Sequence, residues 1–335
     1  MTIKDLAKKT GYGVATVSRV LNNQPNVSEK AWRTIMQAAQ QNNFQINVNA
    51  KHLKQQHATS ILVVVKGTSN EMFAEMVETI QSIIAKTAYP LFVDYQDEDE
   101  DEVRRAVQLC RERKPRGILF LGGNRENFLA SFDKIDIPCV LVSNDASELP
   151  FANLSSVSTD DRQAACCAID TLVALGHRDF AIIGGDRTVS DTSRLRYEGC
   201  LQSFHNHNIS FDEALNYQVT RFSYQGGYDA TKKLLSHGRK FTALFAAADV
   251  MAIGAIRALR DCGLRVPEDV SVVGFDGLPL SGFLVPQLST VAQSVTTMAQ
   301  RSVEILLSCL EEGSAACHET VPFSIYQRES TQRLD

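Results

Sequence analysis

The sequence predicts a small three-helix unit in residues 1–58, followed in residues 59–335 by an α/β body with parallel sheets. Three observations support this division. The length of 335 residues suits two domains of roughly 100–200 residues each. Residues 1–57 hold eight lysines and arginines and two acids, a net charge of +6, whereas the remainder carries −11. From residue 59 onward, apolar runs alternate with helical patterns, which is typical of parallel sheets covered by helices.

Three short helices are expected in the N-terminal unit. Thr2 and Asp5 begin the first, which ends at Gly11, and the second spans residues 14–22. Ser28 caps the third. The side chains expected to pack inward from the second and third helices are Val17, Val20, Leu21, Trp32, Ile35, Met36 and Ala39. The glycine-containing turn between the first two helices predicts a helix-turn-helix unit.

The second helix of such a unit lies in the major groove of DNA. Helical spacing places Ala15, Ser18, Arg19 and Asn22 on its outer side. Arg19 suits the O6 and N7 acceptors of guanine, a contact worth about 1–3 kcal/mol of discrimination. Thr16 and Ser18 suit phosphates. The alternative is a solvated helical hairpin in which Arg19 contacts only water, but the local positive charge favours DNA binding.

Three segments of this unit form a recognisable signature: Asp5–Ala7, Ala15–Asn22 and Asn26–Ser28. They resemble the headpiece of the lactose- and galactose-repressor family of bacterial transcription regulators. The resemblance implies that Val14, Ala15 and Arg19 read the operator bases. Val14 and Ala15 are small and apolar, which implies methyl contacts with thymine. Gly13 departs from the family, which usually has a capping serine at this position.

Residues 44–57 contain neither proline nor glycine and form a polar linker that can become helical. By resemblance, this segment is the family's hinge helix, which folds on DNA and inserts a leucine into the minor groove. Leu53 aligns with that leucine, and Ala50 with the residue beside it. Inserting an apolar side chain costs a few kcal/mol of unstacking, which the contacts allowed by the bent DNA offset. Ile46 and Val48 stand where the family commonly has proline and arginine.

Seven apolar runs predict strands in the body, at residues 60–65, 90–95, 117–121, 138–142, 180–183, 243–247 and 271–275. At this length, two doubly wound lobes are favoured over one large sheet. Sheets of this kind bind ligands beyond the carboxyl ends of their strands. The segments expected there are residues 66–73, 122–124, 143–145, 184–186, 248–249 and 276–277.

The family resemblance continues through residues 174–177, 271–276 and 286–291, and so covers essentially the whole chain. It implies a periplasmic-binding-protein-like pair of lobes with an effector, a sugar or related metabolite, in the cleft. Arg196 and Asp276 would hold effector hydroxyls, and Asp249 would flank the pocket. Phe73 and Phe222 would supply aromatic walls.

The residue types alone leave other interpretations open. Asp249 and Asp276 equally suit the N-caps of following helices, and Arg196 suits an ion pair with a local acid. Ala248 and Ser143 stand where many sugar-responsive relatives have asparagine and aspartate. Their lost polarity argues against a simple hexose and also permits a regulator controlled by a protein partner.

No catalytic, cofactor or metal site is predicted. The sequence has no G-x-S-x-G elbow and no P-loop. The acidic run 97–102 is interpreted as a solvated segment entering a helix. Eight cysteines without a C-x-x-C pair suit reduced core thiols. Without a signal peptide or a long apolar stretch, we expect a cytoplasmic protein with no membrane span.

The sequence therefore predicts a homodimeric, operator-binding transcription regulator, a repressor, controlled by a small-molecule effector. Two protomers require two half-sites, so the operator is expected to be near-palindromic double-stranded DNA. One alternative is a solute-binding protein for sugar uptake, against which the basic headpiece and the missing export signal count. Another is an α/β enzyme that uses Asp249 or Asp276 as a base, but no nucleophile or cofactor loop accompanies them.

Overall fold

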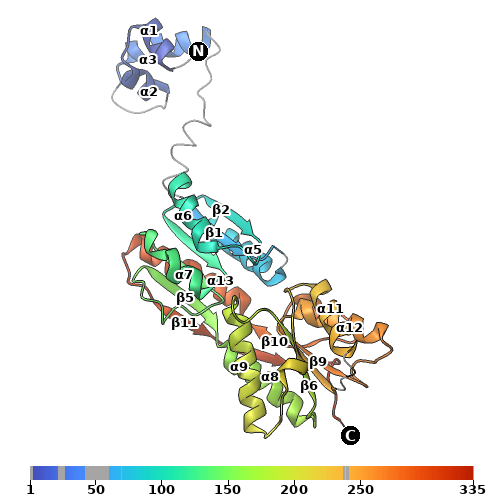
Figure 1. Ribbon diagram of the computed structural model, residues 1–335. Helices are drawn as coiled ribbons and strands as arrows, with labels where there is room; N and C mark the ends of the chain where they lie inside the picture. Colours follow the sequence, from blue (N-terminus) through green and yellow to red (C-terminus); the bar gives the residue numbers. More distant parts are fainter. Residues whose placement is uncertain are drawn as a thin grey trace. The chain divides into compact units, whose positions relative to one another are not determined.

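The computed structural model describes residues 3–21, 27–41, 60–68, 70–236, 238 and 241–334. The chain divides into two compact units, Met1–Gln56 and His57–Asp335 (Figure 1). The domain boundary expected after residue 58 lies outside the described residues. The same holds for the expected hinge helix with Ala50 and Leu53.

The N-terminal unit contains, in its described part, the helices α1 (Ile3–Thr10), α2 (Val14–Leu21) and α3 (Glu29–Gln41). Gly11, at φ +73°, ends α1. At the start of α3, the Ala31 N–H donates to Ser28 Oγ over 3.3 Å, as expected of a cap. The helices enclose a core of Leu6, Ala7, Val17, Val20, Ala31, Ile35 and Ala39. The predicted helix-turn-helix headpiece is confirmed.

Trp32 does not belong to this core. Its side chain is 43% exposed, and the preceding Ala31 is buried instead. The inward side of α3 follows Ala31, Ile35 and Ala39, at intervals of four residues, and Met36 is half-buried beside them. The prediction began the inward stripe at Trp32, whereas in the structure it begins one residue earlier, at Ala31.

The first lobe of the body is built on a six-stranded sheet of order β11-β5-β4-β3-β1-β2, in which every pair is parallel. Its strands are β1 (Ile61–Lys66), β2 (Leu91–Gln96), β3 (Gly117–Leu121), β4 (Cys139–Val142), β5 (Leu154–Thr159) and β11 (His318–Val321). Helices α5 (Glu71–Ile84) and α13 (Val295–Glu311) cover one face. Helices α6 (Glu102–Arg113) and α7 (Arg125–Ser131), followed by η1 (Phe132–Lys134), cover the other.

The second lobe repeats this plan with the order β12-β10-β9-β8-β6-β7, and only the β10–β12 pair is antiparallel. Its strands are β6 (Phe180–Gly184), β7 (Tyr217–Val219), β8 (Ala243–Ala246), β9 (Ser271–Asp276), β10 (Ser289–Gln293) and β12 (Phe323–Tyr326). One face carries α8 (Asp161–Ala174) and α9 (Asp191–Asn206). The other carries α11 (Tyr224–Ser236) and α12 (Asp249–Asp261). Short α10 (Glu213–Asn216) and η2 (Pro279–Gly282) complete the lobe.

The chain passes between the lobes three times, each time through a single residue between two elements. These residues are Asp160 between β5 and α8, Ser294 between β10 and α13, and Pro322 between β11 and β12. Ser294 Oγ donates to the Pro322 carbonyl over 2.6 Å, so two of the crossings are joined directly. The predicted two-lobed body with parallel sheets is confirmed (Figure 1). None of the described helices combines the length and apolarity needed to cross a membrane.

The headpiece core generates a stability prediction. We expect Ile35→Ala to abolish the cooperative unfolding of the headpiece, because emptying a buried isoleucine site costs about 2–5 kcal/mol. A unit of this size has a small free energy of unfolding, so a loss of this magnitude is enough to unfold it. The larger body should retain its own transition. Differential scanning calorimetry of the whole chain, combined with limited proteolysis, measures both parts.

Trp32→Ala is the matched control, because it removes a larger apolar side chain from the same helix but from its exposed side. It should leave the headpiece protected from protease. A Trp32→Ala variant as destabilised as Ile35→Ala would contradict the orientation of α3.

Candidate functional site

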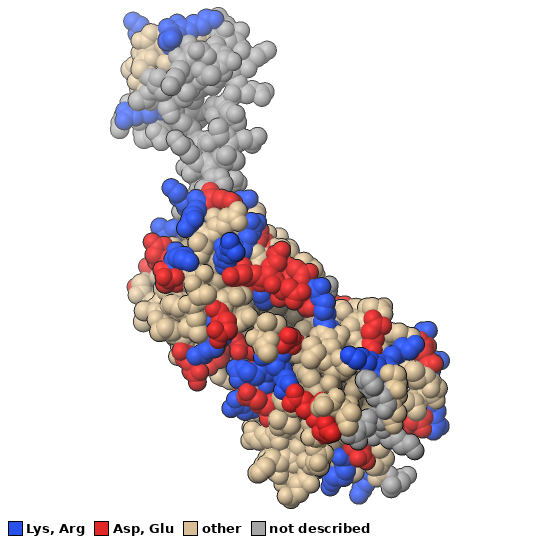
Figure 2. All heavy atoms as spheres, in the orientation of Figure 1, with Lys and Arg blue, Asp and Glu red and all other residues tan. Residues whose placement is uncertain are grey.

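The outer side of α2 is the first candidate site. Arg19 is exposed and Thr16 half-buried, while Val17 and Val20 point into the headpiece core. Lysine and arginine side chains lie on the described surface of this unit, among them Lys8, Lys9, Lys30 and Arg33 (Figure 2). Val14 and Ala15 lie in the first turn of α2, and Ser18 lies further along it. Nothing is described of their side chains or of residue Asn22.

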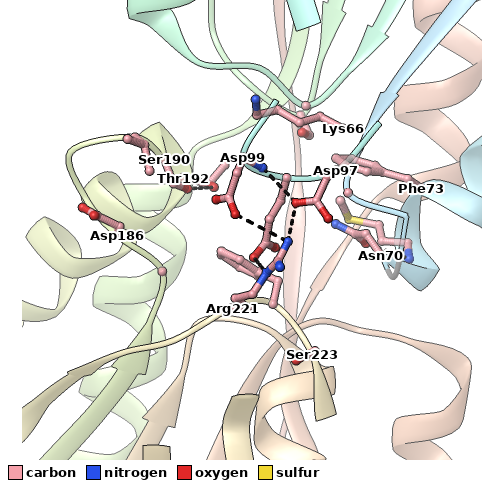
Figure 3. Close-up of a pocket in the computed structure, with 18 of the residues that line it drawn as sticks. Lys66, Asn70, Phe73, Asp97, Asp99, Asp186, Ser190, Thr192, Arg221 and Ser223 are labelled. Carbon is pink, nitrogen blue, oxygen red and sulfur yellow. Dashed lines mark hydrogen bonds and ion pairs between the residues drawn. The ribbon is translucent and has the colours of Figure 1, made fainter. Parts of the chain in front are cut away.

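A cavity of about 510 Å³ between the two lobes of the body is the second candidate site (Figure 3). It is lined from the carboxyl ends of strands in both sheets, where ligands of doubly wound sheets bind. The lining includes residues at or just after the ends of six strands: Lys66 at the end of β1, Gly122 and Gly123 after β3, Ser143 and Asn144 after β4, Gly185 and Asp186 after β6, Thr220 to Ser223 after β7, and Asp276 at the end of β9.

Two phenylalanines contribute aromatic surface from opposite lobes. Phe73, in the first turn of α5, lies against Gly122, where an added Cβ would come within 3.0 Å of the ring. Phe222, after β7, lies against Gly185, where a Cβ would come within 2.7 Å of its ring. A larger residue at either glycine would push the ring away. Both phenylalanines line the cavity, and both glycines lie in segments that the sequence predicts at the strand ends, although it did not predict which ring packs against which glycine.

Arg196 reaches the cavity from α9 and is only 3% exposed. Its Nε donates to Asp161 Oδ1 over 2.7 Å and its Nη1 to the Ala247 carbonyl over 2.5 Å. The guanidinium lies 3.6 Å from the centroid of the Phe275 ring. Its main acidic partner is therefore 35 positions away in the sequence, so the interpretation of a local ion pair was wrong.

Asp276 accompanies Arg196 in the lining. Its Oδ1 accepts a hydrogen bond from Gln293 Nε2 over 2.9 Å and lies 3.6 Å from Arg196 Nη1. Burial raises the pKa of Asp276 to about 6, against the opposing effects of Arg196 and Gln293. The Asp276 carboxyl oxygens can accept hydrogen bonds from ligand hydroxyls.

Asp249 lies outside the lining. It is fully buried in the first turn of α12 and accepts hydrogen bonds from Thr290 Oγ1 over 2.6 Å and from the Leu278 N–H over 2.7 Å. It thereby joins α12 to β10 and to the loop that follows Asp276. Neither aspartate caps a helix, because the N-cap of α12 is Ala248 and Asp276 ends a strand. The capping interpretation was therefore also wrong.

The acidic run 97–102 is not merely solvated. Asp97, Glu98 and Asp99 line the cavity and face Arg221 from the other lobe (Figure 3). Asp101 caps α6, and Glu102 is buried against Lys66 over 2.7 Å. The place of this run at the cavity could have been predicted from the sequence, because the run directly follows β2 and thus lies at the carboxyl edge of the sheet. Among the described residues, no cluster of histidine, cysteine and acidic side chains is arranged to hold a metal ion.

Comparison with known proteins identifies the chain's relatives. Residues 2–47 match the model for bacterial regulatory proteins of the lacI family, and residues 169–331 match a periplasmic binding protein-like domain. The transcriptional regulator MalR of Clostridium butyricum is 34% identical over 335 residues, which cover 98% of this chain and 99% of MalR. The chain belongs to the lacI family of bacterial regulatory proteins.

Other relatives of this lacI-family chain extend the similarity. The probable transcriptional repressor ExuR of Bacillus subtilis (strain 168) is 31% identical, with 100% of this chain and 99% of ExuR aligned. The crystal structure of the Lac repressor dimer bound to operator and the anti-inducer ONPF is 26% identical, covers 99% of each chain and superposes with a TM-score of 0.76. The predicted family and two-part architecture are confirmed, and the relatives are helix-turn-helix transcription regulators.

The buried Asp249 of this lacI-family body generates a prediction about pH. Burial, and to a lesser degree the nearby Asp276, raise the pKa of Asp249 to about 8 from its ordinary value of 3.8. A raised carboxyl pKa favours folding below the unfolded pKa, and this contribution is lost as pH rises through the folded pKa. We therefore expect the urea midpoint of the wild-type body to fall relative to that of Asp249→Asn between pH 5 and about 8.

Asp261→Asn is the control, since Asp261 lies on the same helix and a hydrogen bond from Arg257 lowers its pKa from the ordinary value of 3.8. Its urea midpoint should keep a constant offset from wild type over this pH range. A constant offset for Asp249→Asn as well would contradict the raised pKa.

Proposed function

We propose that this lacI-family chain is a sequence-specific repressor of transcription whose operator affinity is set by a sugar or related metabolite bound between the lobes. The proposal rests on one observation, which is that the same chain contains both a DNA-binding surface and a ligand cavity. An exposed Arg19 lies on the second helix of a basic headpiece, and a polar and aromatic cavity lies at the strand ends of the body. An uptake protein has no use for the first site.

The proposed DNA contacts follow from the geometry of helix-turn-helix docking. With α2 in the major groove, Arg19 would bind guanine, Val14 and Ala15 would contact thymine methyl groups, and Thr16 and Ser18 would bind phosphates. Asn22 would complete the outer side of α2, and Ala50 and Leu53 would enter the minor groove. The Lac repressor, to which this chain is similar, binds an operator.

The proposed effector contacts combine apolar and polar groups, as sugars require. Phe73 and Phe222 would pack against the apolar faces of a sugar ring, while Asp276 accepts from its hydroxyls and Arg196 donates to them. Asp249 would act indirectly, by holding the loop that follows Asp276. To control DNA binding, the effector must bind the DNA-competent and incompetent states with different affinities.

We further propose a homodimer that acts in the cytoplasm, without catalytic activity, cofactor or metal. A near-palindromic operator presents two half-sites to a twofold protein, and the similar Lac repressor structure is a dimer. The described body carries two conspicuous apolar side chains on the loop after η2, Phe283 at 83% exposure and Val285 at 90%. A second copy would cover them.

The headpiece proposal is tested by Arg19→Ala. We expect this variant to lose about 1–3 kcal/mol of preference for its operator over a variant operator, because a bidentate guanine contact disappears. Quantitative gel shifts on palindromic DNA, at several salt concentrations, measure preference and affinity separately.

Arg33→Ala is the matched control, since it removes the same charge from α3 of the same headpiece. It should weaken binding to all DNA alike and leave the preference intact. An unchanged preference in Arg19→Ala would remove its assignment as a base reader. Failure of the wild type to select any palindrome, with or without sugars, would refute the proposed function.

The dimer proposal is tested by the double variant Phe283→Ser and Val285→Ser. Replacing the two side chains should shift the protein toward monomers and weaken operator binding at least about 10-fold, since each headpiece then binds alone. Analytical ultracentrifugation measures the association. Leu201→Ser, at an exposed apolar position on α9, should leave it unchanged. An unaltered dimer in the double variant would place the interface elsewhere.

A further inference from the structure

An ion-pair cluster spans the cavity between the two lobes. Arg221, from the loop after β7, contacts Asp97 and Glu98 on the loop after β2, and Asp99 Oδ2 lies 3.7 Å from the same guanidinium (Figure 3). All four residues line the cavity. One arginine of the second lobe thus faces three carboxylates of the first, and we call this cluster the latch.

Two further contacts join the lobes near the latch and the cavity. Tyr224, three residues after Arg221, donates its hydroxyl to Glu71 at the start of α5. The Arg125 N–H, at the start of α7, donates to Asp191 Oδ2 at the start of α9 over 3.0 Å. Each of the three contacts pairs a group of one lobe with a group of the other, so the described body has its lobes held together around the cavity.

Charge around the cavity is unevenly matched. Its lining contains the cations Lys66, Arg196 and Arg221 and the carboxylates Asp97, Glu98, Asp99, Asp186 and Asp276. Each of these three cations already has an acidic partner. Lys66 pairs with Glu102, Arg196 with Asp161, and Arg221 with the acidic loop. The lining therefore carries an excess of negative charge and presents no cation without a carboxylate neighbour.

This arrangement is unfavourable for an anionic ligand. A phosphate or carboxylate at Arg221 would have to displace Asp97 or Glu98, and at the buried Arg196 it would lie beside the carboxylate of Asp276. It would also approach three carboxylates at the latch, whose repulsion is strengthened by the low-dielectric walls of a cleft. A ligand with hydroxyl groups faces no such cost, because carboxylates accept their hydrogen bonds.

We propose that the latch excludes anionic ligands from the cavity, so that the effector is an uncharged polyhydroxyl compound and not a sugar phosphate or sugar acid. This inference rests on the proposed function only in taking the cavity as the effector site. Arg221 and the acidic loop are thus specificity-determining residues, in addition to those that hold the ligand.

The test neutralises the acidic side of the latch in the full-length chain with Asp97→Asn, Glu98→Gln and Asp99→Asn. The variant keeps Asp101 and Glu102, which cap α6 and pair with Lys66. Inorganic phosphate at about 10 mM, compared with chloride at equal ionic strength, is the probe. Thermal unfolding of the body is the readout, since a ligand of the folded state raises Tm by mass action.

We expect phosphate to leave the wild-type Tm unchanged and to raise that of the triple variant by at least about 2 °C. Adding Arg221→Gln to the triple variant should abolish this rise in Tm. The matched control Glu78→Gln, Asp133→Asn and Asp136→Asn removes three charges from exposed positions of the same lobe outside the lining, and it should behave as wild type.

Three results would overturn the proposal. Phosphate could raise the Tm of the wild type, it could fail to raise the Tm of the triple variant, or its effect on the triple variant could persist after Arg221→Gln. A second arm compares sugars with their phosphates on the wild type. Any sugar phosphate that raises Tm more than its parent sugar would also overturn it. Because the readout is melting of the body, a failure of operator binding would not affect the outcome.

Discussion

The buried guanidinium of Arg196 holds together the second lobe's side of the cavity. A charge removed from water is costly unless it is paired with an opposite charge and hydrogen-bonded. Arg196 meets this requirement by drawing on Asp161 at the start of α8, the carbonyl of Ala247 after β8, and Asp276 at the end of β9. Three segments that are distant in sequence must therefore come together wherever this arginine is buried.

The backbone shows where the cavity imposes a cost on the fold. Ser143 at φ +75° and Asp276 at φ +112° adopt the left-handed region without being glycine, and both line the cavity. Such residues each cost of order 1–3 kcal/mol and persist only where the surroundings enforce them. Ser143 directly follows β4 and Asp276 ends β9, so one strained polar residue lies at the cavity in each lobe.

Much of this architecture follows from the sequence because apolar runs report burial directly. The seven predicted strands correspond to β1–β4, β6, β8 and β9, whereas β5, β7, β10, β11 and β12 were missed. Strand β5 contains buried serines that are satisfied by hydrogen bonds, such as Ser155 accepting from the Cys317 N–H, and these erase the apolar signal. The others are short edge strands or carry polar side chains.

Phe73, Phe222, Arg196 and Asp276 were predicted as cavity residues through motif resemblance. Arg221 was missed because its partners depend on how two lobes face each other, which no local pattern encodes.

The three single-residue crossings at Asp160, Ser294 and Pro322 have a mechanical consequence. Three short tethers, two of them bonded to each other, leave little room for the lobes to slide or to separate as free bodies. Short connections of this kind favour a hinge-like rotation of one lobe against the other. A ligand that contacts both lobes fixes the angle between them. The signal that ligand binding produces in the body is therefore a change in this one angle.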